Sequence, residues 1–134
     1  QLLMENMPPF PWFFGGQYYC NNFMRAEEIA EFCERTGTSL CYDTSHAKLW
    51  CNFAGKDLRD HMQTLMPYID YLHLADAAGV DGEGIQIGEG EIDWERLVPL
   101  IQKLDVQMTR EIWRGHERNG EGFKQAALIM EELL

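Results

Sequence analysis

Four side chains that can bind a metal ion follow or end four separate apolar runs of this sequence. Glu5, Asp43 and Glu111 end the first, second and fourth runs, and His73 lies within the third. Three carboxylates and one imidazole suit Mn²⁺, Mg²⁺ or Co²⁺ better than a structural zinc, which prefers Cys and His. A single acid in such a place would mean little, because acids also cap helices. Three converging carboxylates would repel one another without a cation, so the four donors together predict a metal site.

The four apolar runs alternate with helical segments. We expect strands at residues 2–5, 39–43, 71–74 and 107–112, and helices at about 22–35, 56–66, 93–104 and 122–134. Strands that alternate with helices imply parallel pairing and right-handed crossovers. The 134 residues give about 33 residues per unit, which is the repeat size of a (β/α)8 barrel of about 250 residues. The sequence therefore predicts an α/β fold of four βα units, half of a TIM barrel.

Capping residues set the expected ends of these helices. Asn22 and Asp93 are predicted N-caps, whereas Gly37 and Pro67 are predicted to stop the helices that precede them. The stretches between strand and helix are predicted loops, and the one at residues 75–92 is rich in glycine and acids. Strand-end donors and loops of this kind carry function in parallel βα folds, since the carboxyl ends of the strands share one edge.

Composition excludes several classes of protein. The 22 acidic residues against 11 basic ones give a net charge of −11, which disfavours nucleic acid as a partner. No apolar run approaches the roughly 20 residues of a membrane span, and residues 1–16 lack the basic start of a signal peptide. The four cysteines, Cys20, Cys33, Cys41 and Cys51, form no CxxC pair. Cys33 on a helix face and Cys41 in a strand fall where buried free thiols are usual, and the chain is larger than most disulfide-stapled domains, so we expect reduced thiols and a cytoplasmic protein.

The ordered motifs resemble the xylose isomerase-like barrel superfamily. They are Glu-Asn at 5–6, Asp-Thr-Ser-His at 43–46, His-Leu-Ala-Asp at 73–76, Gly-Glu-Gly at 88–90 and the strand-end Glu111. That superfamily holds sugar-phosphate isomerases and epimerases of the tagatose/psicose 3-epimerase type, and abasic-site nucleases of the endonuclease IV type. The resemblance spans residues 2–134. It implies one partial domain over residues 1–134 that corresponds to the C-terminal four βα units, without the N-terminal half of the barrel.

The resemblance also implies roles for individual residues. Glu5, Asp43, His73 and Glu111 would hold one divalent ion, Mn, Mg, Co or Zn, and Glu5 and Glu111 would transfer protons on opposite faces of a substrate. His46 matches a substrate-contacting histidine of the epimerases and a metal ligand of the nucleases. The implied activity is that of a sugar or sugar-phosphate isomerase or epimerase that works by proton transfer through a metal-bound enediolate.

Departures from the family patterns keep two alternatives open. Gly79 stands where epimerases of this group usually have an arginine that holds substrate oxygens. The segment from Asp81 to Glu83 retains the aspartate of the nuclease branch but lacks its histidine ligand. The alternatives are a metal-dependent hydrolase or nuclease on the same scaffold and a metal-binding domain without turnover. Gly88–Gly90 is interpreted as a loop-shaping element, with Glu83 or Glu89 as less favoured substrate contacts.

Two loops supply further candidate substrate contacts. Arg114 and His116 follow the fourth strand and either hold an anionic group beside the metal or belong to a solvated loop. The aromatic loop at residues 8–14, with Trp12 and Phe13, is predicted to form an apolar wall over the site or to pack against a missing or partner half. The expected partners are a small-molecule sugar and either a second copy of the chain, which would supply four more strands, or a missing half-barrel.

Overall fold

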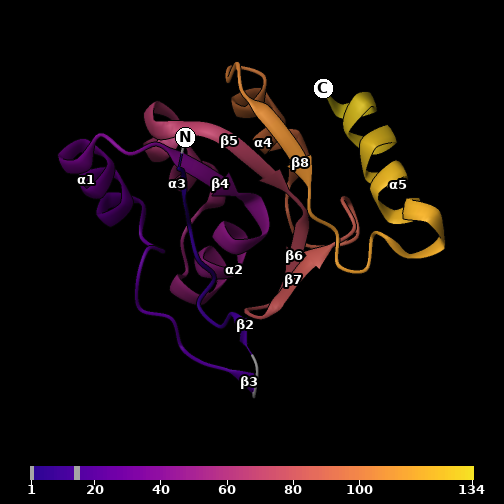
Figure 1. Ribbon diagram of the computed structural model, residues 1–134, viewed down its shortest axis with the longest axis horizontal. Helices are drawn as coiled ribbons and strands as arrows, with labels where there is room; N and C mark the ends of the chain where they lie inside the picture. The colour runs from indigo at the N-terminus through magenta and orange to yellow at the C-terminus, as the bar shows by residue number, and fades with distance from the viewer. Residues whose placement is uncertain (1, 14–15) are drawn as a thin grey trace.

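The computed structural model describes residues 2–13 and 16–134, and a four-stranded parallel sheet organises them (Figure 1). The strand order is β1-β4-β5-β8, so each strand pairs with the strand of the next βα unit. The bounds are β1 (Met4–Glu5), β4 (Leu40–Asp43), β5 (Ile69–Leu74) and β8 (Gln107–Arg110). This topology confirms the predicted α/β class with parallel strands.

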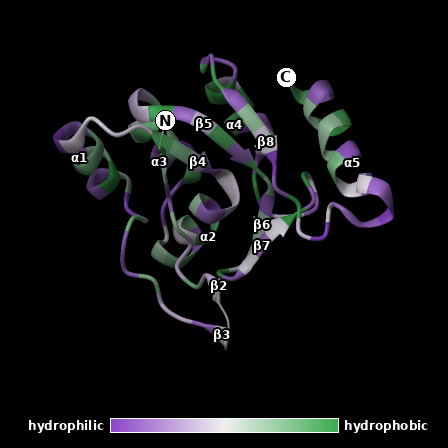
Figure 2. Cartoon of the chain, viewed as in Figure 1, coloured by the Kyte–Doolittle hydropathy of each residue, from purple (hydrophilic) through white to green (hydrophobic). Residues whose placement is uncertain are grey.

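One face of this sheet is covered by helices. The helices are α1 (Ala26–Thr36), α2 (Thr44–Ala54), α3 (Leu58–Leu65), which continues into the short 3-10 helix η1 (Met66–Tyr68), α4 (Trp94–Ile101) and α5 (Glu117–Leu133). Leu40, Tyr42, Leu72 and Leu74 point from the strands into the core that these helices complete. Figure 2 shows the apolar residues of β4, β5 and α4 in the interior of the molecule. Among the described residues, no helix has the length and apolar character that crossing a bilayer requires.

The segment after β4 is a helix, and the prediction of a loop there is wrong. α2 follows β4 directly, because the Asp43 side chain accepts a hydrogen bond from the His46 amide and caps the helix. It ends at Gly55, whose φ of 64° is left-handed. The predicted start at residue 56 therefore belongs to α3, which Asp57 caps. The capping residues Asp43 and Gly55 flank a run with four buried hydrophobic residues, Ala47, Leu49, Trp50 and Cys51. Caps on both sides of such a run were the signal in the sequence from which this helix could have been predicted.

The other helix ends agree in part with the caps expected from sequence. α1 begins at Ala26 rather than near Asn22, because Phe23 has a φ of 60° that no regular helix accommodates. Gly37 ends α1 as predicted, and Asp93 caps α4 by accepting from the Arg96 amide. α5 begins earlier than predicted, but it is kinked by left-handed residues 118–120 and is regular only beyond them.

Two hairpins occupy segments that were predicted as loops. β6 (Asp76–Ala78) and β7 (Gly82–Ile85) pair antiparallel within the glycine-rich segment that follows β5. β2 (Trp12–Phe13) pairs with β3 (Gly16–Gln17) in the aromatic segment. The side chain of Phe13 and residues 14–15 lie outside the described part, so the predicted role of Phe13 stays a prediction.

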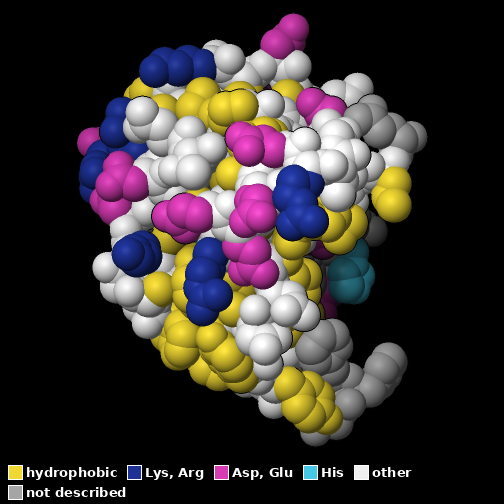
Figure 3. Space-filling model, turned by 90° about the vertical axis from the view of Figure 1, so that its left-hand side faces the viewer, with side chains coloured by type: hydrophobic (Ala, Val, Ile, Leu, Met, Phe, Trp, Pro, Cys, Tyr) yellow, Lys and Arg dark blue, Asp and Glu magenta, His cyan; other side chains and the backbone are white. Residues whose placement is uncertain are grey.

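Charged side chains of both signs are mixed on the surface that carries α1. Figure 3 shows Lys and Arg interspersed with Asp and Glu on that face. A single-sign basic patch, which would attract a phosphate backbone, is not visible there.

Candidate metal centre

The structure brings the four predicted donors together at one edge of the sheet. One oxygen or nitrogen atom from each of Glu5, Asp43, His73 and Glu111 lies within 4.8 Å of the corresponding atoms of the other three. Glu5 ends β1, Asp43 ends β4, and His73 lies near the end of β5. Glu111 follows β8, and its amide donates to the Leu74 carbonyl oxygen at 3.0 Å, which extends the pairing between β5 and β8 by one step. Parallel strands put all four donors at the same edge, as expected.

Asn6 fixes the spacing between β1 and β4. Its side-chain nitrogen donates to the Asp43 carbonyl oxygen at 3.0 Å, and the Asp43 amide donates to its side-chain oxygen at 2.8 Å. These two bonds continue the strand pairing past the end of β1 and hold Glu5 beside Asp43. Asn6 is only 1% exposed. No separate role for Asn6 was predicted from the sequence, although the Glu-Asn pair at residues 5–6 was a signal for one.

The first residues of α2 form hydrogen bonds both with the Asp43 side chain and with the backbone that follows β5. Oδ1 of Asp43 accepts from the His46 amide at 2.7 Å, while Oδ2 lies 3.8 Å from Nδ1 of His73. The Thr44 hydroxyl donates to the Ala75 carbonyl oxygen at 2.8 Å and accepts from the Ala75 amide at 3.1 Å. One carboxylate oxygen therefore caps a helix, while the other faces the donor cluster.

Nδ1 of His73 lies at the centre of the cluster. It is 2.7 Å from Oε2 of Glu111, 3.5 Å from Oε1 of Glu5 and 3.8 Å from Oδ2 of Asp43. This buried nitrogen nevertheless has no well-directed hydrogen bond within the described residues. A ring nitrogen surrounded by carboxylate oxygens and without a directed partner matches the donor set of a divalent cation. The residues present therefore fit such an ion.

The carboxylates of the cluster have pKa values that move in opposite directions. Burial raises the pKa of Asp43 to about 6. Burial also acts to raise the pKa of Glu5, but its close contacts and charge interactions with His46 and His73 outweigh burial and lower the pKa to about 2. The interaction with His73 lowers the pKa of Glu111. Glu5 and Glu111 are therefore carboxylates at neutral pH in the metal-free chain.

The two histidines are held as cations by their surroundings in the metal-free chain. Contacts with Cys41 first, and then with Glu111 and Glu5, raise the pKa of His73 to about 12. Burial acts to lower the pKa of His46, but Asp43 and Glu5 outweigh burial and raise it to about 9. Both cations neutralise part of the negative charge of the cluster, a task that a bound metal ion would take over.

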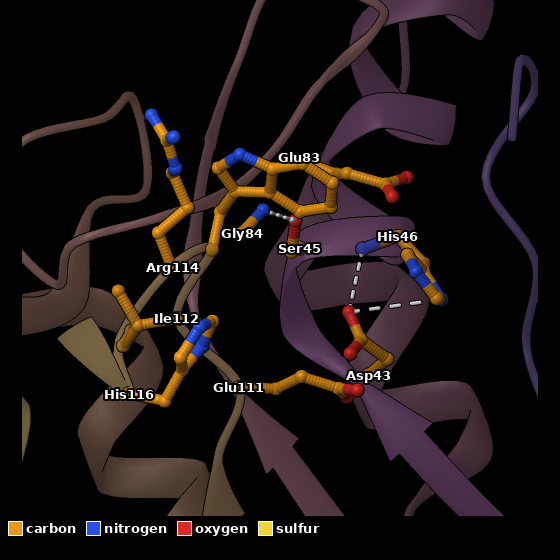
Figure 4. Close-up of a pocket in the computed structure, with 10 residues that line it drawn as sticks. Asp43, Ser45, His46, Glu83, Gly84, Glu111, Ile112, Arg114 and His116 are labelled. Carbon is orange, nitrogen blue, oxygen red and sulfur yellow. Dashed lines mark hydrogen bonds and ion pairs between the residues drawn. The ribbon is translucent and has the colours of Figure 1, made fainter. Parts of the chain in front are cut away.

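A cavity of about 370 Å³ opens beside the cluster, within the usual size range of small-molecule sites (Figure 4). The predicted residues His46, Arg114 and His116 line it, together with Glu83, whose pKa is raised by burial. The complete lining is Asp43, Ser45, His46, Glu83, Gly84, Glu111, Ile112, Trp113, Arg114 and His116.

Three predicted contacts have a different place or orientation. Nε of Arg114 lies 2.9 Å from Oε1 of Glu117, and Figure 4 shows its guanidinium pointing away from the carboxylates. Trp12 is 57% exposed on the β2–β3 hairpin, and neither Trp12 nor Glu89 belongs to the cavity lining found in residues 2–13 and 16–134.

The outer wall of the cavity was missed by the sequence analysis. The Trp113 amide donates to the Gly84 carbonyl oxygen at 2.7 Å, and the Gly84 amide donates to the Ser45 hydroxyl at 3.0 Å. A Cβ atom on Gly84 would lie 3.2 Å from the Trp113 backbone, and the φ of Gly84 is 70°. The β6–β7 hairpin thus joins the loop after β8 to the start of α2. In the sequence, a glycine within a strand, here Gly84, is the signal of such a close approach.

Comparisons with known proteins agree with this architecture. A family model described as xylose isomerase-like TIM barrel matches residues 1–133. A D-tagatose 3-epimerase-like protein matches with a TM-score of 0.70 at 19% identity, over 98% of this chain and 45% of its own. The 3-keto-D-glucoside 4-epimerase YcjR from E. coli, in its apo form, has a TM-score of 0.67 at 12% identity, over 97% of this chain and 45% of its own. An L-ribulose 3-epimerase has a TM-score of 0.60 at 16% identity, and the match covers 98% of this chain and 50% of the epimerase.

These matches define the extent of the fold. The chain spans about half the length of each of these structures, which confirms the prediction of half a TIM barrel. At these identities the likeness shows the fold alone. No curated protein matches the chain.

Proposed function

This chain belongs to the xylose isomerase-like TIM barrel family, and on that premise we propose that it is a divalent-metal-dependent sugar or sugar-phosphate isomerase or epimerase. The observation that carries the proposal is the convergence of Glu5, Asp43, His73 and Glu111 beside a cavity of small-molecule size. The three similar structures are those of a D-tagatose 3-epimerase-like protein, a 3-keto-D-glucoside 4-epimerase and an L-ribulose 3-epimerase, which supports a sugar substrate.

Glu5, Asp43, His73 and Glu111 would hold the ion, with Asp43 fixed by the α2 amide and His73 contributing Nδ1. When bound, a divalent ion polarises a substrate carbonyl and acidifies the C–H bond beside it. The protein's part is to keep the three carboxylates and the imidazole preorganised, which the Asn6 and Thr44 hydrogen bonds support.

Glu5 and Glu111 are the proposed proton-transfer residues. β1 and β8 are the outer strands of the sheet, so the two glutamates approach the site from opposite sides, with Asp43 and His73 between them. Both have lowered pKa values and are therefore available as bases at neutral pH. One carboxylate accepts the proton from carbon, and the same or the facing carboxylate returns it. Isomerisation of this kind needs no oxidant or reductant.

His46 and the wall of the cavity are the proposed substrate contacts. Nδ1 of His46 lies 2.9 Å from the Asn6 carbonyl oxygen and donates to it, which leaves Nε2 for a sugar oxygen. His116 and Trp113 face the same cavity from the loop after β8. Arg114 reaches an anionic substrate group only if its side chain turns from Glu117 into the cavity. Trp12 is left outside the proposed contacts.

Deuterium exchange tests this function. The chain, loaded with Mn²⁺, is incubated with a panel of ketoses and ketose phosphates in D2O, and the carbon next to the carbonyl is followed by NMR. We expect label from solvent at that carbon, and its loss in Glu111→Gln but not in the surface variant Asp105→Asn. Mn²⁺ binding without label in any ketose would contradict the epimerase and favour a metal-binding domain without turnover. Cleavage of an abasic-site oligonucleotide would instead favour the nuclease alternative.

A further inference from the structure

A free thiol lies directly below the four-residue cluster. Cys41 and Asp43 are two residues apart on β4 and therefore point to the same face of the sheet. Cys41 pairs with Glu5 of β1 on one side and with Tyr71 of β5 on the other. It is 7% exposed. The thiol thus occupies the next position inward from the strand ends.

Cys41 forms a second donor group with two members of the first. Its sulfur, a carboxylate oxygen of Glu5 and a ring nitrogen of His73 all lie within 4.8 Å of one another. We call the cluster of Glu5, Asp43, His73 and Glu111 the outer group, and the cluster of Glu5, Cys41 and His73 the inner group. The two groups share Glu5 and His73 and differ in their remaining donors, which are two carboxylates in the outer group and the Cys41 sulfur in the inner group. The other three cysteines belong to no such group in the described part of the chain. His73, whose Nδ1 has no well-directed hydrogen bond, is one of the two residues that both groups share.

The two groups differ in the ions that they suit. Carboxylate oxygens favour Mn²⁺ and Mg²⁺, whereas a thiolate selects Zn²⁺, Cd²⁺ and other thiophilic ions. Sulfur and nitrogen bind zinc at about 2.3 and 2.0 Å, so donors within 4.8 Å of one another need only small rotations to reach one ion.

We propose that Glu5, Cys41 and His73 form an inner, thiolate-containing position that takes thiophilic divalent ions and excludes Mn²⁺ from the outer position. Both positions use Glu5 and His73, so one chain binds one ion in either place, not two. When the ion binds, the thiol proton leaves to solvent and a sulfur–metal bond forms, with no change of oxidation state. The proposal shares two residues with the proposed function but does not depend on turnover.

The electronic spectrum of the Co²⁺-loaded chain tests the inner position directly. Thiolate ligation gives an intense near-ultraviolet charge-transfer band that oxygen and nitrogen ligands do not give. We expect this band in the wild-type chain and in Cys20→Ser, which removes a thiol elsewhere, and its loss in Cys41→Ser. A wild-type spectrum without the band, or a band that survives Cys41→Ser, would overturn the proposal.

Competition between ions provides the second measurement. Cd²⁺ should release Mn²⁺ from the wild-type chain one for one, as followed by the EPR signal of free Mn²⁺. Cys41→Ser should weaken Cd²⁺ binding at least about 100-fold, beyond what the loss of an outer-shell partner usually costs, while Mn²⁺ affinity stays within a few-fold. Simultaneous binding of both ions would overturn the proposal. If Cys41→Ser fails to bind Mn²⁺ as well, the wild-type Co²⁺ band decides. Failure of deuterium exchange with these results intact would count against the proposed function alone.

Discussion

Asp76 and the carboxylates of the metal cluster all lie near strand ends, but their surroundings are opposite. Asp76 follows β5, is fully buried and accepts four hydrogen bonds. The donors are the amides of Ala77 and Ile92 at 2.8 and 2.9 Å, the amide of Gly88 at 3.0 Å and Nε1 of Trp94 at 2.8 Å. In the metal cluster, the Asp43 side chain accepts a hydrogen bond from one backbone amide, that of His46. The carboxylates of Glu5 and Glu111 instead lie against the rings of His46 and His73.

The difference separates a structural acid from a candidate ligand. The donors around Asp76 come from the chain itself, so its charge is fully stabilised without an ion. They also shape the loop: Gly88 supplies an amide, and a Cβ atom on Gly90 would collide with the Asp76 carboxylate. The cluster carboxylates accept fewer hydrogen bonds from the chain and retain acceptor capacity that a cation can use. Position at a strand end alone does not distinguish the two; the number of chain donors does.

The largest expected effect is the loss of stability in Asp76→Asn. The isosteric amide presents N–H groups to two of the four donors, leaving them unsatisfied in the interior. We expect a loss of about 2–4 kcal/mol, or about 10 °C in melting temperature, measured by circular dichroism. The exposed Asp105→Asn should change stability by less than about 0.5 kcal/mol. A melting temperature for Asp76→Asn equal to that of Asp105→Asn would refute the structural role of Asp76.

The next effect is stabilisation by the metal, and Asp43→Asn should remove it. At 100 times its dissociation constant, Mn²⁺ should stabilise the wild-type chain by about 2.7 kcal/mol. Asn keeps the α2 cap but removes the charge of Asp43, whose pKa is raised to about 6 by burial. The metal-free variant should therefore be at least as stable as the wild type at pH 7.5. A clear loss of metal-free stability would show that Asp43 is structural, like Asp76.

A smaller effect is expected for His61, a buried histidine whose two ring nitrogens are both hydrogen-bonded. Nε2 of His61 donates to the Met24 carbonyl oxygen at 2.9 Å, and Nδ1 accepts from the Tyr42 hydroxyl at 3.0 Å. Burial lowers the pKa of His61, so the unfolded chain binds the proton more readily than the folded one. Stability from this group is therefore present above about pH 6.5, the ordinary histidine pKa, and is lost as the pH falls below it.

The measurement is urea unfolding of the metal-free wild type and of His61→Gln between pH 7.5 and 5.5. The wild type should lose more stability across this range than the variant, because only the wild type carries His61. Equal losses in the two proteins would contradict a neutral, satisfied His61.

The smallest effect on stability is expected for Arg114→Ala. The ion pair with Glu117 is exposed, so its removal should change stability by less than about 0.5 kcal/mol. The KM for a ketose phosphate should rise while kcat stays unchanged, with Arg118→Ala as the matched control. An unchanged KM would remove Arg114 from the substrate site and leave it as a surface residue.

The sequence predicted what parallel strands dictate and missed what distant contacts create. Glu5, Asp43 and Glu111 could be placed because the ends of parallel strands share an edge. α2 was missed because its first turn is polar, although Asp43 and Gly55 capped it. The roles of Asn6 and of Trp113 depend on partners about 30 to 40 residues away in the chain, which no local pattern encodes.

The cation requirement of the cluster is the central claim, and calorimetric titration of the metal-free chain with Mn²⁺ tests it most directly. We expect one ion per chain, with binding abolished in Asp43→Asn and Glu111→Gln and retained in Asp105→Asn. Absence of binding in the wild type, or binding that persists unchanged in both cluster variants, would contradict the claim.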